Sequence, residues 1–237
     1  MLQKNFVNKY LFLRFHNFAQ MNKKALGYIG FFVALTALFV VFVFAGTDNW
    51  KSKSPVISYV KPFVFTTQNK TPFTENNMRG KVCVVNFFFT TCKGVCPVMN
   101  NNLDKVYNEF KNEKDFLIVS HTCDPETDSA AQLKHYADSM KVDTHKWVFL
   151  TGRKDSLYNA ARNSYLIDDP NNNVGNINDQ FLHSQFVALV DKFGNVRGQV
   201  YDALKPNDVK LMEESIKTLL KETKPPETTG IGTSFAQ

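Results

Sequence analysis

Two cysteines and the turn between them carry the clearest chemistry in this sequence of 237 residues. Cys92 and Cys96 stand in the segment NFFFTTCKGVCP, where an apolar strand pattern ends and Pro97 begins a helical pattern. Unpaired backbone N–H groups and the dipole at a helix start favour a thiolate over a thiol. The segment therefore predicts reactive thiols at the beginning of a helix.

The spacing of these cysteines allows two kinds of chemistry. Three residues separate them, which puts both sulfurs on one side if the segment turns helically, and Gly94 lets that turn tighten. Such sulfurs can close a disulfide or hold one metal ion, and CxxxC leaves metal binding more open than CxxC does. Copper accepts a mixture of thiolate and imidazole ligands. Whether the chain supplies a third ligand therefore helps to decide between a disulfide and a metal site.

Five histidines could supply that ligand. His183 ends the polar, asparagine-rich loop 168–180 and stands just before a predicted strand. A loop of this length inside a compact domain usually has a purpose, although a surface position is the simpler expectation for a lone histidine. His121 ends a predicted buried strand near the expected site, where packing or a turn hydrogen bond is its simpler role. We expect the others to take no part in the site: His16, His135 and His145.

The two remaining cysteines are predicted to be strand residues. Cys83 lies in the apolar run VCVVNFFF, and Cys123 ends the run FLIVSHTC. Four cysteines outside the cytoplasm would ordinarily suggest two disulfides, but these surroundings favour small buried side chains. Cys123 has an alternative role as an extra thiol within reach of the cysteine turn, where it could resolve a disulfide or serve as a ligand.

Alternating strand and helix patterns position the cysteine turn. A β-hairpin is predicted ahead of the domain from 59–65 and 72–74, with Pro62 limiting its first strand to an edge. The strands that follow are 82–89, 116–120, 147–150, 186–190 and 196–201, and the helices are 97–110, 130–140, 155–165 and 206–220. The segment 124–128 is expected to supply a turn and the N-cap of the second helix. This order predicts an α/β sandwich with a mixed central sheet, whose sites lie at strand carboxyl ends.

The net charge of +6 belongs to the N-terminal flank. Residues 1–46 hold five basic and no acidic residues, so the remainder carries 23 basic against 22 acidic side chains. A nucleic-acid partner is therefore not expected. Residues 25–46 form an uncharged apolar run of about 30 Å as a helix, enough to span a bilayer. Positive charge before it predicts a cytoplasmic flank 1–24 and an extracytoplasmic domain.

The domain boundaries follow from these patterns. After the transmembrane segment we expect a linker at 47–58, one domain at 59–222 and a disordered tail at 223–237. A cleaved signal peptide is the alternative to the anchor, although the apolar run is long for one. Met21 begins a conventional MNKK flank, which suggests that residues 1–20 are an over-long start.

In several separated features the chain resembles the Sco/SenC family of membrane-anchored, thioredoxin-like copper proteins. These are the N-terminal anchor, the block from Gly80 to Pro97, the DPxxD turn at 124–128, and a histidine before a strand that continues into LVDxxG at 189–194. The resemblance covers roughly residues 59–220. It implies a thioredoxin-like three-layer sandwich, with the hairpin and the membrane helix preceding its core.

The resemblance also implies a ligand set and a function. Cys92, Cys96 and His183 correspond to the copper ligands, and Asp124 to an acidic position near the site, although a turn or cap explains Asp124 equally well. Family members deliver copper to the binuclear centre of cytochrome c oxidase or reduce its cysteines. The expected partners are the copper-bearing oxidase subunit or another cuproprotein, and a thiol reductant. Cys123 departs from the family pattern, which has an aliphatic residue there.

Two hypotheses follow for the inner membrane or its equivalent. The first is a metallochaperone that holds Cu(I) or Cu(II) on Cys92, Cys96 and His183 and passes it on by ligand exchange. The second is a thiol–disulfide oxidoreductase, in which Cys92 attacks a partner disulfide and Cys96 resolves the mixed disulfide. Only the second would be an enzyme. A copper or redox sensor would use the same residues.

Overall fold

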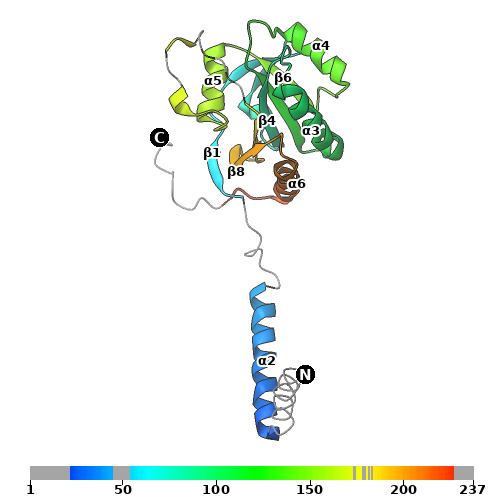
Figure 1. Ribbon diagram of the computed structural model, residues 1–237, viewed down its shortest axis with the longest axis vertical. Coiled ribbons are helices and arrows are strands. Elements are labelled where there is room, and N and C mark those ends of the chain that lie inside the picture. The colour runs from blue at the N-terminus through cyan, green and yellow to red at the C-terminus, as the bar shows by residue number, and fades with distance from the viewer. Residues whose placement is uncertain are drawn as a thin grey trace, which may run out of the picture. The chain divides into compact units, whose positions relative to one another are not determined.

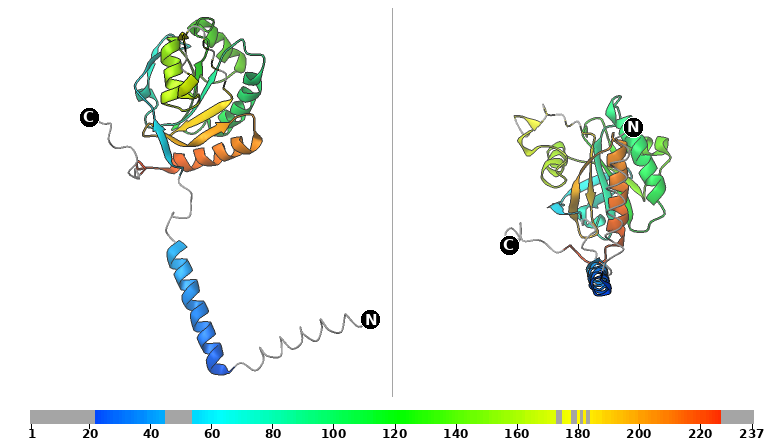
Figure 2. Two further views of the ribbon diagram at one scale, coloured as in Figure 1. Left: turned by 60° about the vertical axis from the view of Figure 1, so that its left-hand side comes forward. Right: turned by 60° about the horizontal axis from the view of Figure 1, so that its bottom comes forward.

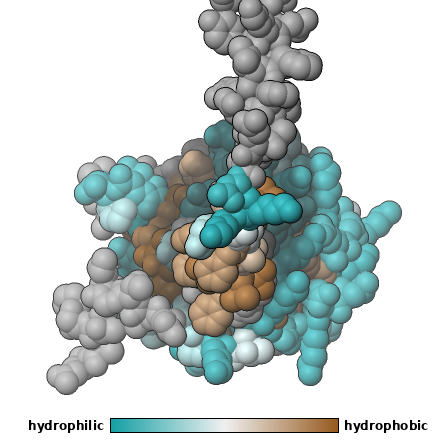
Figure 3. All heavy atoms as spheres, turned by 90° about the horizontal axis from the view of Figure 1, so that it is seen from below, coloured by the Kyte–Doolittle hydropathy of each residue, from teal (hydrophilic) through white to brown (hydrophobic). Residues whose placement is uncertain are grey.

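The computed structural model describes residues 22–44, 54–172, 175–177, 180, 182 and 184–226. The chain divides into two compact units, Met1–Lys53 and Ser54–Gln237. Within the first unit, α2 (Lys23–Phe44) contains most of the predicted apolar run (Figure 1). Its segment Lys23–Phe42 has a mean hydropathy of 2.3, and it is long and apolar enough to cross a membrane. Figure 3, which views this helix from below, shows its hydrophobic side chains gathered in the centre of the view.

Eight strands among the described residues form one mixed sheet in the second unit. They are β1 (Val56–Tyr59), β2 (Val64–Thr67), β3 (Pro72–Thr74), β4 (Val82–Phe88), β5 (Phe116–Thr122), β6 (Trp147–Thr151), β7 (Phe186–Val190) and β8 (Asn195–Asp202). Their order is β1-β8-β7-β4-β5-β6-β2-β3, and β4, β5 and β6 run parallel while the other pairs are antiparallel. The predicted mixed central sheet is confirmed.

Helices cover both faces of this sheet and complete three layers. The helices are α3 (Val95–Phe110), α4 (Ala130–Met140), α5 (Lys154–Asn163) and α6 (Pro206–Lys221). One core cluster joins α3, α4 and α6 to one face, and a second joins α5 to the other. Figures 1 and 2 show α5 across the sheet from α3 and α6. We call these the α3 face and the α5 face.

The central strands are buried on both faces, as their sequence predicts. All seven residues of β4 and all seven of β5 are buried. Alternate residues therefore enter different clusters: Val84 and Phe88 face α3, whereas Cys83 and Phe87 face α5. A strand that lies between two helical layers is expected to carry apolar residues on both of its faces.

The predicted hairpin was wrong in its first strand. The segment 59–65 is divided between β1, which pairs with β8 at one edge, and β2, which pairs with β3 and β6 at the other. Pro62 lies in the connection between them, where its missing N–H costs no sheet hydrogen bond. The hairpin β2–β3 is therefore part of the central sheet and not an addition ahead of it.

Two helix starts also differ from the sequence expectation. Helix α3 begins at Val95, so Cys96 and Pro97 both lie in its first turn. The N-cap of α4 is Ser129, whose side chain accepts a hydrogen bond from the Gln132 N–H, and not a residue of 124–128. The carboxylate of Asp128 is turned inward instead, where it accepts hydrogen bonds from Thr90 and Thr122.

Candidate metal and thiol site

The cysteine turn joins the end of β4 to the start of α3. Cys92 donates its N–H to the Phe89 carbonyl at 3.2 Å, and Gly94 is the N-cap of α3. Cys92 is half-buried, whereas Cys96 is only 4% exposed and packs in the α3-face cluster. The sequence prediction of two thiols at a helix start is therefore correct, with one sulfur open to solvent and the other behind it.

The two thiols differ in acidity because their surroundings differ. Partial burial opposes ionisation of Cys92, but hydrogen bonds from the Cys96 thiol and from backbone N–H groups at the start of α3 lower its pKa overall. Burial, and then the hydrogen bond to Cys92, raise the pKa of Cys96 to about 12. Cys92 is thus the more acidic thiol of the pair, and the Cys96 thiol is its hydrogen-bond donor.

A buried carboxylate holds the strand end that leads into this turn. Asp128 is fully buried and accepts hydrogen bonds from the Thr90 N–H at 3.1 Å, the Thr90 hydroxyl at 2.5 Å and the Thr122 hydroxyl at 2.6 Å. Thr90 follows β4 and Thr122 ends β5, so one carboxylate ties the two parallel strand ends together. The sequence analysis gave Asp128 only a turn or capping role and gave Thr90 none, because the two residues that meet here lie 38 positions apart in the chain.

A pocket of about 280 Å³ opens beside the cysteine turn. It is lined by Phe89, Cys92, Lys93, Gly94, Val95, Ser184 and Gln185. His183, the predicted third ligand, lies outside the described residues. Its neighbours are described: Ser184 lines the pocket together with Cys92, and Leu182 is buried in the α5-face cluster. Among the described residues no group of three or more His, Cys, Asp or Glu side chains could hold a metal.

The other two cysteines are buried thiols, as predicted. Cys83 and Cys123 belong to the α5-face cluster and are 0% and 1% exposed. Burial raises the pKa of Cys83 to about 12 and that of Cys123 well above its ordinary value. The Cys123 N–H donates to the Phe88 carbonyl at 2.7 Å, which places its backbone beside the end of β4. All four cysteines are free thiols in the structure.

His121 lies on the opposite face of the sheet from Cys96. It is fully buried in an aromatic cage on the α5 face, formed by Phe63, Phe65, Phe87 and Tyr165. Its ring stacks on Phe87 at a centroid distance of 4.9 Å, and neither ring nitrogen has a hydrogen-bond partner. Desolvation lowers its pKa to about 3. The packing role expected for His121 is confirmed.

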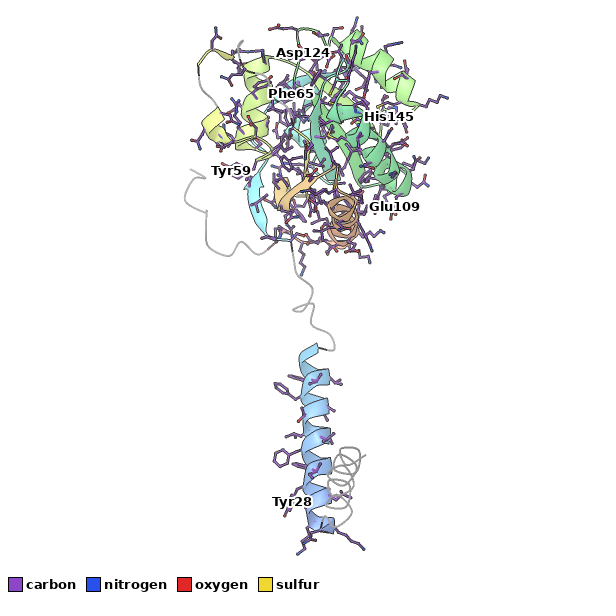
Figure 4. All side chains as sticks on the ribbon, in the orientation of Figure 1. Tyr28, Tyr59, Phe65, Glu109, Asp124 and His145 are labelled. Atoms are coloured by element: carbon purple, nitrogen blue, oxygen red, sulfur yellow. The ribbon has the colours of Figure 1, made fainter. Side chains whose placement is uncertain are left out.

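Asp124 forms the turn that was expected but caps no helix. Its carbonyl accepts from the N–H groups of Thr127 and Asp128, and its own N–H donates to the Thr122 hydroxyl at 2.9 Å. Figure 4 labels Asp124 at the end of the domain where β5 finishes. Parallel strands finish at one edge of a sheet, so Asp124 shares this edge with the cysteine turn.

Comparisons with known proteins agree with this fold. A family model described as SCO1/SenC matches residues 52–221. The SCO1 protein homolog of Bacillus subtilis (strain 168) is 29% identical over 166 residues, which are 68% of this chain and 83% of that protein.

Solved structures of similar proteins share the architecture. BsSco, described as a member of the Sco family of cytochrome c oxidase assembly proteins with a disulfide switch, gives a TM-score of 0.60 at 26% identity, over 72% of this chain and 98% of that one. Yeast Sco1 with copper bound gives a TM-score of 0.53 at 28% identity, over 68% of this chain and 90% of that one. These likenesses confirm the predicted thioredoxin-like α/β fold.

Proposed function

The chain belongs to the SCO1/SenC family, and from this we propose that it is a membrane-anchored copper metallochaperone for cytochrome c oxidase. Yeast Sco1 has been solved with copper bound, and BsSco is described as a member of a family of oxidase assembly proteins. The proposal extends to this chain because Cys92 and Cys96 lie together at the start of α3, and the sequence also contains His183.

One observation carries the proposal. The thiols of Cys92 and Cys96 share a hydrogen bond at the start of α3, beside a pocket that Ser184 also lines. A soft ion such as copper favours thiolate ligands, and imidazole completes a set that suits either oxidation state. We assign Cys92, Cys96 and His183 as the ligands, because the residue next to His183 reaches the same pocket as Cys92.

The same geometry suits a site that gives its ion away. Cys92 is half-exposed and lies against an open pocket, so an incoming ligand from a partner can reach the metal without unfolding the domain. Metal transfer by ligand exchange requires such an incompletely closed site. The copper-bearing subunit of cytochrome c oxidase is the proposed recipient. A thiol reductant must keep the pair open, because a Cys92–Cys96 disulfide would remove both sulfur ligands.

We further propose that α2 holds the domain at the membrane. Basic residues precede α2 and occupy its first two positions, Lys23 and Lys24, and the rest of the helix carries no charge. By the positive-inside rule this arrangement directs the domain to the extracytoplasmic side. A copper carrier held on that side would work near the centre that it loads.

The difference in acidity between the two thiols favours a second function, thiol–disulfide exchange. Hydrogen bonds lower the pKa of the half-exposed Cys92, and burial raises that of Cys96. The Cys92 thiolate would attack a partner disulfide and release one partner thiolate, and Cys96 would then displace the second. The partner gains two electrons as a dithiol, the chain is left with a Cys92–Cys96 disulfide, and a thiol reductant restores it.

An anaerobic copper titration of the reduced full-length protein in detergent tests the first function. We expect one tight equivalent with a thiolate-to-Cu(II) charge-transfer band, greatly weakened in His183→Ala and unchanged in His145→Ala, which removes an exposed histidine. Binding that is indifferent to His183 would contradict the ligand set. Dithiol exchange should survive His183→Ala, because it needs only the two cysteines, so the same variant separates the two functions.

A further inference from the structure

Helix α5 contacts the start of the asparagine-rich loop 168–180 and also Leu182, just after that loop. Arg162 is 5% exposed, and its Nε donates to the Asp168 carboxylate at 2.7 Å. It also donates to the Asn172 carbonyl at 3.3 Å. One helical turn earlier, Tyr158 meets the chain again at Leu182. Two buried side chains of a single helix thus fix where the loop leaves the domain and where it returns.

The hydroxyl of Tyr158 lies between two backbone segments. It accepts a hydrogen bond from the Leu182 N–H at 3.1 Å and donates to the Cys123 carbonyl at 3.0 Å, with the Gln180 carbonyl at 3.4 Å. The ring is fully buried, and this burial raises the pKa of Tyr158 to about 12, so the hydroxyl keeps its proton near neutral pH. We call the chain Cys123 C=O, Tyr158 O–H, Leu182 N–H the Tyr158 bridge.

This bridge connects the loop to the cysteine side of the sheet. The Cys123 N–H donates to the Phe88 carbonyl at 2.7 Å, and Phe88 is the last residue of β4. Leu182 is therefore linked through Tyr158 and Cys123 to the strand that delivers the Cys92 turn. The link uses backbone atoms of Cys123, so the unusual thiol at that position is not needed for it.

We infer that Tyr158 is a positioning residue for copper binding: its hydroxyl holds Leu182, the residue before the proposed ligand in sequence, against the strand end that leads to the two cysteines. The inference rests on the proposed function, in which His183 is the third ligand. A ligand on a free loop must lose chain entropy when it binds the metal, and a hydrogen bond that fixes its neighbour reduces this cost. Tyr158 would thus raise copper affinity without contacting the ion.

The test compares two tyrosine-to-phenylalanine variants in the full-length protein in detergent. Tyr158→Phe keeps the buried ring and removes the bridge. Tyr165→Phe is the matched control, because Tyr165 is also fully buried on the α5 face, but its hydroxyl meets the Met78 sulfur at 3.7 Å. Copper affinity is measured by competition with a chelator under reducing, anaerobic conditions. We expect about tenfold weaker binding for Tyr158→Phe, as the loss of one buried hydrogen bond implies, and less than about twofold change for Tyr165→Phe.

Two further measurements keep failure of the bridge separate from failure of the proposed function. His183→Ala defines the affinity without the third ligand, and amide hydrogen exchange at Leu182, followed by NMR, reports the bridge without copper. Faster exchange in Tyr158→Phe alone is expected. Wild-type affinity in Tyr158→Phe, above that of His183→Ala, would overturn the inference, as would an equal loss in Tyr165→Phe. If His183→Ala binds like wild type, the ligand set fails, and unchanged Leu182 exchange would then overturn the bridge as well.

Discussion

The two faces of the sheet hold similar residues in opposite chemical states. At the edge of the α3 face, Cys92 is half-exposed, and hydrogen bonds from the helix start lower its pKa. On the α5 face, Cys83, Cys123 and His121 are buried among apolar side chains, and burial keeps each of them neutral. The positions of these residues in the fold, and not their types, decide which of them can react.

The difference arises from where backbone donors remain free. The first turn of a helix has N–H groups without partners in the helix, and Cys92 lies where they converge. A strand interior has no such groups, since neighbouring strands pair its backbone, so Cys83 meets only apolar atoms and weak sulfur contacts near 3.8 Å. The edge of the α3 face thus holds a reactive thiol, whereas the thiols of the α5 face serve only in packing.

Alkylation should give the largest contrast between the two faces. With iodoacetamide at pH 7 we expect Cys92 to be modified first and Cys83 not at all while the protein is folded. A rise in the Cys83 pKa from 9.0 to about 12 lowers its thiolate fraction about 1000-fold. Peptide mass spectrometry over time measures both rates. Labelling of Cys92 should slow as the pH falls through its lowered pKa, because the thiolate is then protonated.

Unfolding the protein in urea provides the control for alkylation. All four cysteines should then react at similar rates, since the helix start and the buried sites no longer exist. Folded-state labelling of Cys83 as fast as that of Cys92 would break the comparison between the faces.

Asp128 and Ser129 are neighbours that test which contacts prepare the reactive edge. Asp128→Asn replaces one carboxylate oxygen by an NH2 group that faces donors, and should lower the free energy of unfolding by about 3 kcal/mol. Ser129→Ala removes only the α4 N-cap and should cost about 1 kcal/mol. Urea unfolding of the full-length protein in detergent measures both.

The alkylation rate of Cys92 separates these two variants further. It should change in Asp128→Asn, because Thr90 loses one of its two carboxylate acceptors, and stay at the wild-type value in Ser129→Ala. An equal effect of both variants on this rate would show that general loosening of α4, and not the Thr90 contact, controls the turn.

Local patterns in the sequence predicted most of the fold and the two cysteines. The buried strands β4 and β5 are mostly apolar on both faces, and the inward residues of α6 recur at helical spacing. These elements can therefore be recognised without knowing their distant partners. The cysteine turn combines a strand end, a glycine and an early proline, which together specify a helix start.

Features that depend on contacts between distant segments were not predictable in the same way. The segment 59–65 has a continuous strand pattern, but its two ends pair at opposite edges of the sheet, and only the assembled sheet decides this. The position of Asp128 just before α4 in the sequence suggests a helix cap, but its carboxylate points inward and accepts a hydrogen bond from Thr90, 38 positions away. Tyr158 gave no local signal, because Cys123 and Leu182 meet it only in the folded chain.

The free energy of unfolding should fall in acid, because His121 is held neutral on the α5 face. Desolvation lowers its pKa from 6.5 to about 3, so between these values the unfolded chain binds a proton that the folded protein does not. Stability from this group is therefore complete above pH 6.5 and is lost as the pH falls toward 3. Between pH 7 and pH 5 the loss from His121 should be about 2 kcal/mol.

The variant His121→Phe isolates this term, because phenylalanine keeps a ring in the aromatic cage and cannot take up a proton. Urea unfolding at pH 7 and pH 5 should show a loss about 2 kcal/mol smaller in His121→Phe than in wild type. His135→Phe, at an exposed histidine, should keep the wild-type loss, since that side chain is solvated before and after unfolding. Copper binding at pH 7 should be unaffected by His121→Phe, because the cage lies across the sheet from Cys96. Equal acid losses in wild type and His121→Phe would mean that His121 is already protonated in the folded protein, and the α5 face would then hold a charge that its apolar packing is expected to exclude.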